Sequence, residues 1–346
     1  MRANHVLAAD VGGTKTAVVL GAAGARWPGI VEEKVYPSQD YPTFEDVIAE
    51  FLALPKAREH ASRIAAACVC VAGPVEEERA TTTNLRWTID AHHLGERFGI
   101  RTVRLFNDFV AAAVGVGRLD PGDMETLQAG RDVVHGARAV VGAGTGLGVA
   151  LMTWSGGSYT AHASEAGHAD FAPVDEVQDG LLQYLRRQYE RVSYERVLSG
   201  AGLSNIFRYL AGRKQPTQAM LEALDRERDD AAVVSRFGLE RQDPVAVQAL
   251  DVFAAIYGAF AGNIALTVLA RGGVYIAGGI APKIAAKLKD GALVGAFTDK
   301  GRFSSLLRSF PLHVVMNSRV GLYGALDLAR GLAGGAQRPA RVSHLR

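Results

Sequence analysis

Residues 5–21 read HVLAADVGGTKTAVVLG, two short apolar runs on either side of a glycine turn. Apolar runs that flank glycines are typical of a β-hairpin. Glycine permits positive φ and lets backbone N–H groups come close to an anion, and the hydroxyl of Thr14 adds a donor. The segment therefore predicts a strand, a turn that can hold a phosphate, and a second strand. An ordinary polar hairpin turn is the alternative.

The same pattern starts again near the middle of the chain. The apolar residues 139–141 lead into GAGTGLG, residues 142–148, and the apolar residues 149–152 follow. The segment is not a Rossmann fingerprint, because a strand and not a helix is predicted to follow it, and it lacks the Gly-Lys-Ser/Thr end of a P-loop. A glycine-kinked strand is the alternative. Two halves that begin alike indicate a duplicated architecture.

The rest of the chain alternates between predicted helices and strands, which indicates an α/β fold with a sheet of mixed direction. Helical spacing predicts helices over residues 43–54, 107–116, 244–269 and 320–332, and a mostly helical region over 178–243. Short apolar runs predict strands over residues 64–71, 101–106 and 274–277. The last strand ends in a third glycine turn, Ala277–Pro282, where a flat ring could approach the backbone closely.

The composition is that of a folded and nearly neutral protein. The 346 residues include 38 basic and 36 acidic side chains, a formal net charge of +2, and 48% are hydrophobic. This balance excludes a disordered chain and argues against a nucleic-acid partner bound through bulk charge. The length predicts roughly two domains. The 39 glycines are about 11% of the chain against roughly 7% on average, which indicates many close backbone approaches.

No feature of the sequence indicates a secreted or membrane protein. The start, MRANHVLAAD, has no apolar signal core, and no apolar run approaches the roughly 18 residues that a bilayer-spanning helix needs. Cys68 and Cys70 cannot form a disulfide framework; they share one face of a predicted strand and are predicted to be buried thiols. We therefore expect a cytoplasmic protein with no membrane partner.

Two aspartates stand where predicted strands end. Asp10 precedes the first glycine turn, and a carboxylate beside a phosphate cradle makes sense mainly where a divalent cation offsets the repulsion. Asp108 follows Asn107 at the start of a predicted helix, whose N-terminal dipole favours an ionised carboxylate. Such a carboxylate can accept a proton from a substrate hydroxyl in phosphoryl transfer. The alternative for this pair is a helix cap without a chemical role.

A polar cluster, SEAGHADF at residues 164–171, interrupts an apolar stretch. Glu165 and His168 would lie on one side of a turn and supply an acceptor and a switchable donor, which suits neighbouring sugar hydroxyls. Metal ligation by Glu165, His168 and Asp170 is the alternative, although the spacing is not of the HExxH type. Glu195, in YERVLSGAGL, is less distinctive, because a lone Glu before a helix is usually a solvated cap.

Seven motifs in chain order resemble those of the bacterial glucokinases, the ATP-dependent hexokinases of the actin-like ATPase superfamily. They are DVGGTKT, NLRWTID, FNDFVAAAVG, GAGTGLGVALM, SEAGHADFAP, YERVLSGAGL and VYIAGGIAPKI, and with the final helix they extend over residues 5–332. The glycine motifs are shared across the superfamily, whereas SEAGHADFAP together with ERVLSG is specific to this branch. The resemblance implies an α/β fold of two ribonuclease H-like domains flanking a substrate cleft.

The resemblance also implies a domain division and a reaction. Residues 1–117, completed by the C-terminal helix 320–332, would form a small α/β domain, residues 118–319 a large one, and residues 333–346 a flexible basic tail. The reaction would be phosphoryl transfer from MgATP to the 6-hydroxyl of D-glucose, giving glucose 6-phosphate and ADP, the first step of glycolysis. Glucose and ATP would be the partners, Mg²⁺ a cofactor, and a homodimer the assembly.

Carried over residue by residue, the resemblance implies Asp108 as the general base on the sugar hydroxyl. The residues that match sugar-binding positions are Asn84, Asn107, Glu165, His168 and Glu195. Those that match nucleotide-binding positions are Ala9, Asp10, Val11, Gly12, Gly13 and Thr14 in the first phosphate loop, Gly144, Thr145 and Gly146 in the second, and Gly278 and Gly279 in the adenosine motif. Asp10 would also hold the magnesium ion through water.

Two positions depart from the glucokinase pattern. Lys15 stands where an asparagine is expected, and Ala166 stands where a glycine is usual. These departures leave open a kinase for another hexose or an amino sugar. ADP or polyphosphate as the phosphoryl donor also remains open.

Two alternatives come from other classes of protein. A sugar-sensing regulator that does not phosphorylate would need room for a helix-turn-helix before the first strand, which is expected at about residue 5. A cytoskeletal or chaperone-type ATPase would have no use for Glu165 and His168 as sugar ligands. Both are therefore less favoured than a kinase.

Overall fold

The computed structural model describes residues 4–82, 85–334 and 341–343, so Asn84, a predicted sugar ligand, lies outside the described residues. The fold is mixed α/β, as the sequence predicts. The chain divides into two compact units: unit 1 comprises residues 1–120, 152–163 and 319–346, and unit 2 comprises residues 121–151 and 164–318. The predicted division into two ribonuclease H-like domains, 1–117 with 320–332 and 118–319, stays a prediction.

Unit 1 is built on a five-stranded sheet with the strand order β3-β2-β1-β4-β7. Its strands are β1 (His5–Val11), β2 (Lys15–Ala22), β3 (Ile30–Pro37), β4 (Ile64–Val71) and β7 (Thr102–Asn107). β2 runs antiparallel to β1 and β3, whereas β4 runs parallel to β1 and β7. The predicted hairpin at residues 5–21 is therefore confirmed. Nearly every side chain of β1 and β4 is buried, as expected of central strands that are covered on both faces.

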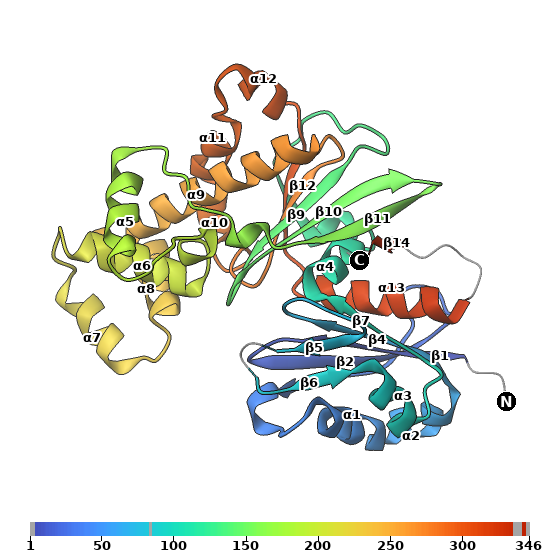
Figure 1. Ribbon diagram of the computed structural model, residues 1–346. Helices are drawn as coiled ribbons and strands as arrows, with labels where there is room; N and C mark the ends of the chain where they lie inside the picture. Colours follow the sequence, from blue (N-terminus) through green and yellow to red (C-terminus); the bar gives the residue numbers. More distant parts are fainter. Residues whose placement is uncertain (1–3, 83–84, 335–340, 344–346) are drawn as a thin grey trace. The chain divides into compact units, whose positions relative to one another are not determined.

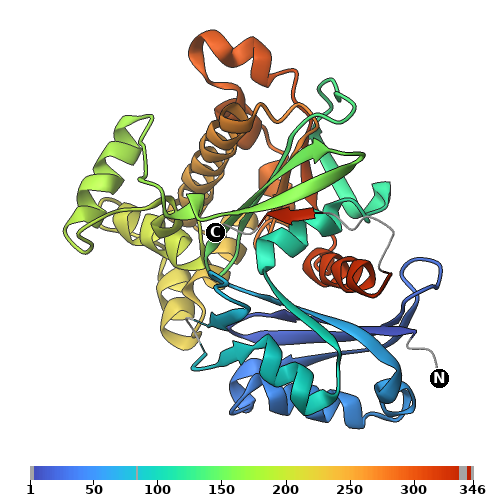
Figure 2. The same cartoon turned by 45° about the vertical axis from the view of Figure 1, so that its right-hand side comes forward.

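Helices cover both faces of this sheet (Figures 1 and 2). On one face lie α1 (Phe44–Ala53), α2 (Pro55–His60) and α3 (Ala91–Phe98), and on the other lie α4 (Asp108–Val116) and α13 (Val320–Gly334). Smaller elements of the unit are η1 (Ser38–Asp40), η2 (Ala61–Arg63), β5 (Arg79–Thr81) and β6 (Thr88–Asp90). Thr43 is the N-cap of α1, because its Oγ1 accepts a hydrogen bond from Asp46 N at 3.3 Å.

The helices α4 and α13 pack backbone against backbone because each carries a glycine where they cross. A Cβ at Gly115 would lie 1.9 Å from Val320 O, and a Cβ at Gly324 would lie 1.7 Å from Ala111 O. A larger residue at either position would force the helices apart. The sequence predicted both helices but not this crossing.

The second sheet has seven strands in the order β14-β11-β10-β9-β12-β13-β8. They are β8 (Met124–Gln128), β9 (Arg138–Ala143), β10 (Leu147–Ser155), β11 (Ser158–Ser164), β12 (Val274–Ala277), β13 (Leu312–Val315) and β14 (Arg341–Ser343). β12 runs parallel to β9 and β13, and β8 runs antiparallel to β13. Because β9 and β10 flank the second glycine turn, the repeated strand, turn, strand pattern is confirmed. Within the predicted tail, residues 333–334 end α13 and β14 pairs with β11.

Unit 2 holds most of the helices. They are α5 (Glu176–Arg186), α6 (Gly200–Ala211), α7 (Gln218–Arg226), α8 (Asp230–Leu239), α9 (Pro244–Val268), α10 (Ala285–Leu288), α11 (Ala292–Thr298) and α12 (Ser304–Leu307), with the 3₁₀ turns η3 (Pro121–Asp123), η4 (Ala166–His168), η5 (Tyr194–Arg196) and η6 (Gly301–Phe303). The mostly helical region predicted over 178–243 is therefore confirmed. The core of the unit joins α9 to the strands β9, β10, β12 and β13 and to α6 and α8.

The helix α9 corrects one statement made from the sequence. Its 25 residues are long and apolar enough to cross a membrane by length and composition, so an apolar segment of that length does exist. Gln248, Asp251 and Asn263 divide this helix into shorter apolar runs. The structure buries 72% of its most apolar window, which is typical of the core helix of a globular domain.

Candidate active site

The turn between β1 and β2 is held by Ser38. Gly12 N donates to Lys15 O at 3.0 Å across the turn, and Ser38 Oγ donates to Gly12 O at 2.8 Å. Ser38 N also donates to Thr14 O at 3.0 Å, and Ser38 Oγ lies 3.0 Å from Thr16 Oγ1. A turn fixed in this way keeps its backbone N–H groups oriented for an anion. Sequence reasoning missed Ser38, whose role depends on the pairing of β2 with β3.

In the two phosphate turns, close neighbours of the glycines, and not the predicted positive φ, explain why glycine is needed. Gly12, Gly144 and Gly146 do not adopt the left-handed φ that only glycine tolerates well. A Cβ at Gly12 would instead lie 3.0 Å from Lys15 O, and a Cβ at Gly146 would lie 2.6 Å from Glu195 Oε2. These turns are therefore constrained by close neighbours on the protein side.

Asp10 lies next to the first turn, at the end of β1. Burial raises the pKa of its carboxyl to about 6, and the positive charge of Lys15 opposes this shift. A desolvated carboxylate of this kind is stabilised in its charged form by a cation beside it. Among the described residues, no group of three or more His, Cys, Asp and Glu side chains could hold a metal ion. A magnesium ion at Asp10 would therefore take most of its ligands from water and phosphate oxygens, as Mg²⁺ commonly does.

Asn107 and Asp108 join β7 to α4. Asn107 is the N-cap: its Oδ1 accepts a hydrogen bond from Phe109 N at 2.9 Å, and its Nδ2 donates to Gly73 O at 3.2 Å. Asp108 lies in the first turn of α4, and its Oδ1 also accepts from Phe109 N, at 2.9 Å. The N-terminus of a helix stabilises negative charge at this position. The structure thus gives Asn107 its capping role, while its sugar contact and the base role of Asp108 stay predictions.

The strand register brings Asp10 and Asp108 to the same end of the sheet. Asp10 lies opposite Cys70 of β4, and Cys70 lies opposite Phe106, two residues before Asp108. Burial raises the pKa of the Cys70 thiol, and the neighbouring Cys68, Asp10 and Asp108 raise it further. Both cysteines are fully buried, as predicted. The carboxyl ends of parallel strands are where α/β sheets bind ligands.

In unit 2, the second phosphate turn lies beside the adenosine motif. Ile280 N donates to Ala143 O at 3.2 Å, directly before Gly144. Gly278 has a φ of 83°, and a Cβ there would lie 2.4 Å from the same Ala143 oxygen. Both features require glycine at 278. The structure therefore brings together the two nucleotide motifs that the sequence predicts far apart in the chain.

Tyr257 of α9 ties these two motifs together. Its hydroxyl accepts a hydrogen bond from Ala143 N at 3.0 Å and lies 3.3 Å from both Val141 O and Ala277 O, to one of which it donates. The residue is fully buried. A buried hydroxyl with both acceptor and donor partners fixes the ends of β9 and β12 relative to each other. The sequence does not predict this role of Tyr257, because a single Tyr in an apolar helix is typical of a residue in the hydrophobic core.

Three predicted sugar ligands lie on two joined turns of unit 2. Glu165 and His168 are held at η4, where Glu165 Oε2 lies 3.9 Å from His168 Nε2, and Glu195 is on η5. Tyr194 N donates to Ala169 O at 2.9 Å, which links the two turns. The side chains of Glu165 and His168 are more than half exposed, so both are available to a ligand.

Asp170, the third residue of the alternative metal site with Glu165 and His168, forms an ion pair instead. Its Oδ1 lies 2.6 Å from Arg191 Nε, and both side chains are exposed. The structure therefore gives this acid a surface ion pair.

Glu195 contacts the second phosphate turn. Its Oε2 accepts a hydrogen bond from the backbone N–H of Leu147 at 3.0 Å, and Leu147 directly follows Gly146. The residue is half-buried. Glu195 is therefore not a solvated helix cap, which was the alternative for this residue. The sequence did not predict its contact with Leu147.

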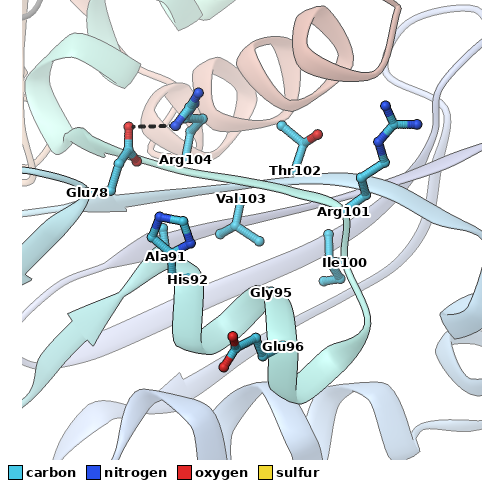
Figure 3. A pocket seen from close by; sticks show the side chains of 10 residues that line it. All are labelled: Glu78, Ala91, His92, Gly95, Glu96, Ile100, Arg101, Thr102, Val103 and Arg104. Carbon is cyan, nitrogen blue, oxygen red and sulfur yellow. Dashed lines mark hydrogen bonds and ion pairs between the residues drawn. The ribbon is translucent and has the colours of Figure 1, made fainter.

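A pocket of about 460 Å³ lies elsewhere in unit 1, between α3 and the amino end of β7 (Figure 3). Its lining includes Glu78, His92, Glu96, Arg101 and Arg104. The figure shows Glu78 paired with Arg104, a bond of 3.1 Å. None of the predicted site residues lines this pocket, and Asn107 lies at the other end of β7, so it is not the candidate active site.

Comparison with known proteins assigns the family. The sequence model of the glucokinases matches residues 7–331, nearly the whole chain. The chain belongs to the glucokinase family. A glucokinase of Synechocystis sp. is 38% identical over 348 aligned residues, which cover 93% of this chain and 96% of that relative.

Solved structures agree with this glucokinase assignment. A glucokinase from an Antarctic psychrotroph is 27% identical and matches with a TM-score of 0.78 over 95% of this chain and 99% of its own. A ROK family glucokinase from Streptomyces griseus, solved with glucose and AMPPNP, is 23% identical, with a TM-score of 0.64 over 94% and 99%, and shows the fold alone. The sequence-based resemblance is thus confirmed, and the expected function, an ATP-dependent glucose kinase, is confirmed at the level of the glucokinase family.

Proposed function

We propose that this member of the glucokinase family transfers the γ-phosphoryl group of MgATP to the 6-hydroxyl of D-glucose, with Asp108 as the general base. The observation that carries the proposal is the position of Asp108, in the first turn of α4 and at the carboxyl end of the parallel strands. The products are glucose 6-phosphate and ADP. The protein would thereby catalyse the first step of glycolysis in the cytoplasm.

In phosphoryl transfer, the protein contributes mainly by positioning the two substrates and by neutralising negative charge on the phosphates. The 6-oxygen of glucose attacks the γ-phosphorus, and the bond from that phosphorus to the β–γ bridging oxygen breaks. The hydroxyl proton passes to the carboxylate of Asp108, and ADP leaves with the electron pair of the broken bond. A general base of this kind must be ionised and within hydrogen-bond reach of the hydroxyl. The N-terminus of α4 favours the ionised form.

The two glycine turns would hold the phosphates. Gly12 N and Gly144 N close the two turns, and the N–H groups of Gly13, Thr14, Thr145 and Gly146 would be the donors to phosphate oxygens. Ala9 and Val11 flank Asp10 on β1. Gly278 and Gly279 would lie against the adenosine. A bound Mg²⁺ supplies positive charge to the phosphates, and Asp10 would hold it through water. The rigid support by Ser38 and Tyr257 keeps both turns in shape before the nucleotide arrives.

Four described residues would recognise the sugar. The carboxylates of Glu165 and Glu195 accept hydrogen bonds from hydroxyls, while His168 and the amide of Asn107 can donate. A site that hydrogen-bonds substrate hydroxyls discriminates strongly against sugars that lack them, because its polar groups are then left unpaired. We further propose two ribonuclease H-like domains that flank the substrate cleft, and a homodimer.

The test of the base is Asp108→Asn, assayed by coupled detection of ADP release with and without glucose. Loss of a general base predicts a fall in kcat of roughly 10²- to 10⁴-fold, while glucose binding by calorimetry changes little. Asp225→Asn, an exposed acid on α7, is the control. Near-wild-type turnover in Asp108→Asn would remove the proposed base, and ADP release without sugar would contradict the kinase.

The substrate is tested separately, because Lys15 and Ala166 depart from the glucokinase pattern. Glucose is compared with mannose, fructose, glucosamine and N-acetylglucosamine, and ATP is compared with ADP and polyphosphate. Glucose with ATP should give the highest kcat/KM. A higher value for another sugar would replace glucose as the substrate and leave the role of Asp108 unaffected.

A further inference from the structure

Glu195 is part of a closed ring of hydrogen bonds that includes the second phosphate turn. Its side chain accepts from Leu147 N at 3.0 Å, and Gly144 O, three residues earlier, accepts from Gly200 N at 2.9 Å. Ser199 Oγ closes the ring by donating to the backbone oxygen of Glu195 at 2.8 Å. The turn, the 3₁₀ turn η5 and the start of α6 are therefore connected, and the carboxylate of Glu195 is the side-chain link.

The turn itself is shaped around this carboxylate. Gly144 N donates to Gly146 O at 2.8 Å, so the turn is a tight one. Glu195 Oε2 lies so close to Gly146 that a Cβ there would be 2.6 Å from it. The backbone N–H groups that would face a phosphate are thus held in place partly by an acidic side chain behind them.

Within the described part of the chain, the other predicted sugar ligands of unit 2 make no hydrogen bond to this turn. Glu165 and His168 are 59% and 56% exposed in their side chains, and lie 3.9 Å from each other. Glu195, in contrast, is half-buried, and one of its carboxylate oxygens accepts the hydrogen bond from Leu147 N. Its second oxygen, Oε1, makes no hydrogen bond within the described part of the chain, and so remains available to a ligand.

We propose that Glu195 is a positioning residue for the nucleotide as well as a sugar ligand, an inference that rests on the proposed function of this site. Through Oε2 it orders the Gly144–Gly146 turn for the phosphates, and through Oε1 it binds a sugar hydroxyl. A sugar that immobilises the carboxylate also stabilises the turn, so sugar and nucleotide bind cooperatively. By linkage, each must raise the affinity for the other by the same factor.

The decisive measurement is nucleotide binding in the absence of sugar. We compare the dissociation constant of MgAMPPNP, measured by calorimetry, for the wild type, Glu195→Ala and Glu195→Gln. Loss of a hydrogen bond to a charged acceptor predicts that Glu195→Ala binds roughly three- to tenfold more weakly. Glu195→Gln should stay within about twofold of the wild type, because its amide oxygen can still accept from Leu147 N.

Two further variants separate this role from sugar binding and from charge. Glu165→Ala removes a predicted sugar ligand that makes no hydrogen bond to the turn among the described residues, so MgAMPPNP affinity without sugar should not change. Glu195→Asp keeps the charge but is one methylene shorter, so it should lose affinity as Glu195→Ala does. Melting temperatures show whether each variant is folded. If Glu195→Ala does not fold, the test is the difference in MgAMPPNP affinity between Glu195→Asp and Glu195→Gln.

Cooperativity is the second readout. Saturating glucose should tighten MgAMPPNP binding by about fivefold or more in the wild type and Glu165→Ala, and by less than about twofold in Glu195→Ala. Unchanged affinity without sugar in Glu195→Ala or Glu195→Asp would overturn the positioning role. Failure of the Asp108→Asn test would instead contradict only the proposed general base. The role of Glu195 is tested independently, because the binding experiment does not depend on catalysis.

Discussion

The carboxylate of Asp10 and the backbone of Gly321 are in close contact: a Cβ at position 321 would lie 2.8 Å from Asp10 Oδ2 and 3.4 Å from its Cγ. Asp10 ends β1 beside the first phosphate turn, and Gly321 is the second residue of α13. The C-terminal helix therefore limits where the proposed magnesium ligand can go, although the two residues are separated by almost the whole chain.

We expect Gly321→Ala to weaken the response to magnesium more than it affects stability. Alanine favours the helix by up to about 1 kcal/mol, but its methyl group forces the Asp10 side chain to rotate. Displacing a group that orients metal-bound water costs roughly tenfold in metal affinity. The half-saturating Mg²⁺ concentration in the ADP-release assay should rise accordingly. Gly295→Ala, where nothing lies within 4 Å of the added Cβ, is the matched control.

Asp10 should make the stability of the protein depend on pH. Burial raises its pKa to about 6 in the folded state, against 3.8 when it is exposed, so the charged form is disfavoured by folding. The cost is therefore present in full above pH 6 and disappears as the pH falls to 4. Asp10→Asn removes this cost and should stabilise the protein at pH 8 by on the order of 3 kcal/mol.

The comparison is made by urea unfolding without nucleotide or Mg²⁺ at pH 8, 6 and 4.5. The stability difference between Asp10→Asn and the wild type should shrink as the pH falls. A difference that is the same at all three pH values would show that the carboxyl is not desolvated. With Mg²⁺ and nucleotide present, the wild type should recover stability that the variant does not gain, because only a carboxylate attracts the cation.

Local sequence patterns predicted the elements that carry the candidate site. Apolar runs around the first glycine turn predicted β1 and β2, and the caps at Thr43 and Asn107 follow from residue type and position. Such signals are local because one strand, one turn or one helix start is specified within a few neighbouring residues. Membership of the glucokinase family could be predicted for the same reason, since its motifs are short and contiguous.

Contacts between distant segments could not be predicted in this way. Ser38 reaches Gly12 only because β3 pairs with β2, and Tyr257 reaches Ala143 across 114 residues of sequence separation. The glycines at 115 and 324 mark a helix crossing that neither helix specifies alone. Each of these features depends on packing geometry, which a single segment does not encode.

We expect Gly324→Ala to destabilise the protein by roughly 2–4 kcal/mol. The added Cβ would lie 1.7 Å from Ala111 O, and a clash with backbone cannot be relieved by a change of rotamer. Because α4 begins with Asp108, separating the helices should also lower kcat. Urea unfolding and the ADP-release assay measure the two effects. A stability equal to that of Gly295→Ala would show that α4 and α13 do not cross so closely.

Tyr257→Phe should weaken both stability and nucleotide binding. Removing the hydroxyl leaves the buried Ala143 N–H without its partner, at a cost of about 1–3 kcal/mol. Ala143 precedes the second phosphate turn, and its oxygen accepts from Ile280 N, so MgAMPPNP affinity should fall as well. Tyr209→Phe is the control, because the Tyr209 hydroxyl is buried and has no hydrogen-bond partner in the described part of the chain. That variant should be neutral or slightly stabilising, since a buried unpaired hydroxyl costs free energy. Equal stabilities for the two Phe variants would mean that the Tyr257 hydroxyl does not hold β9 and β12 together.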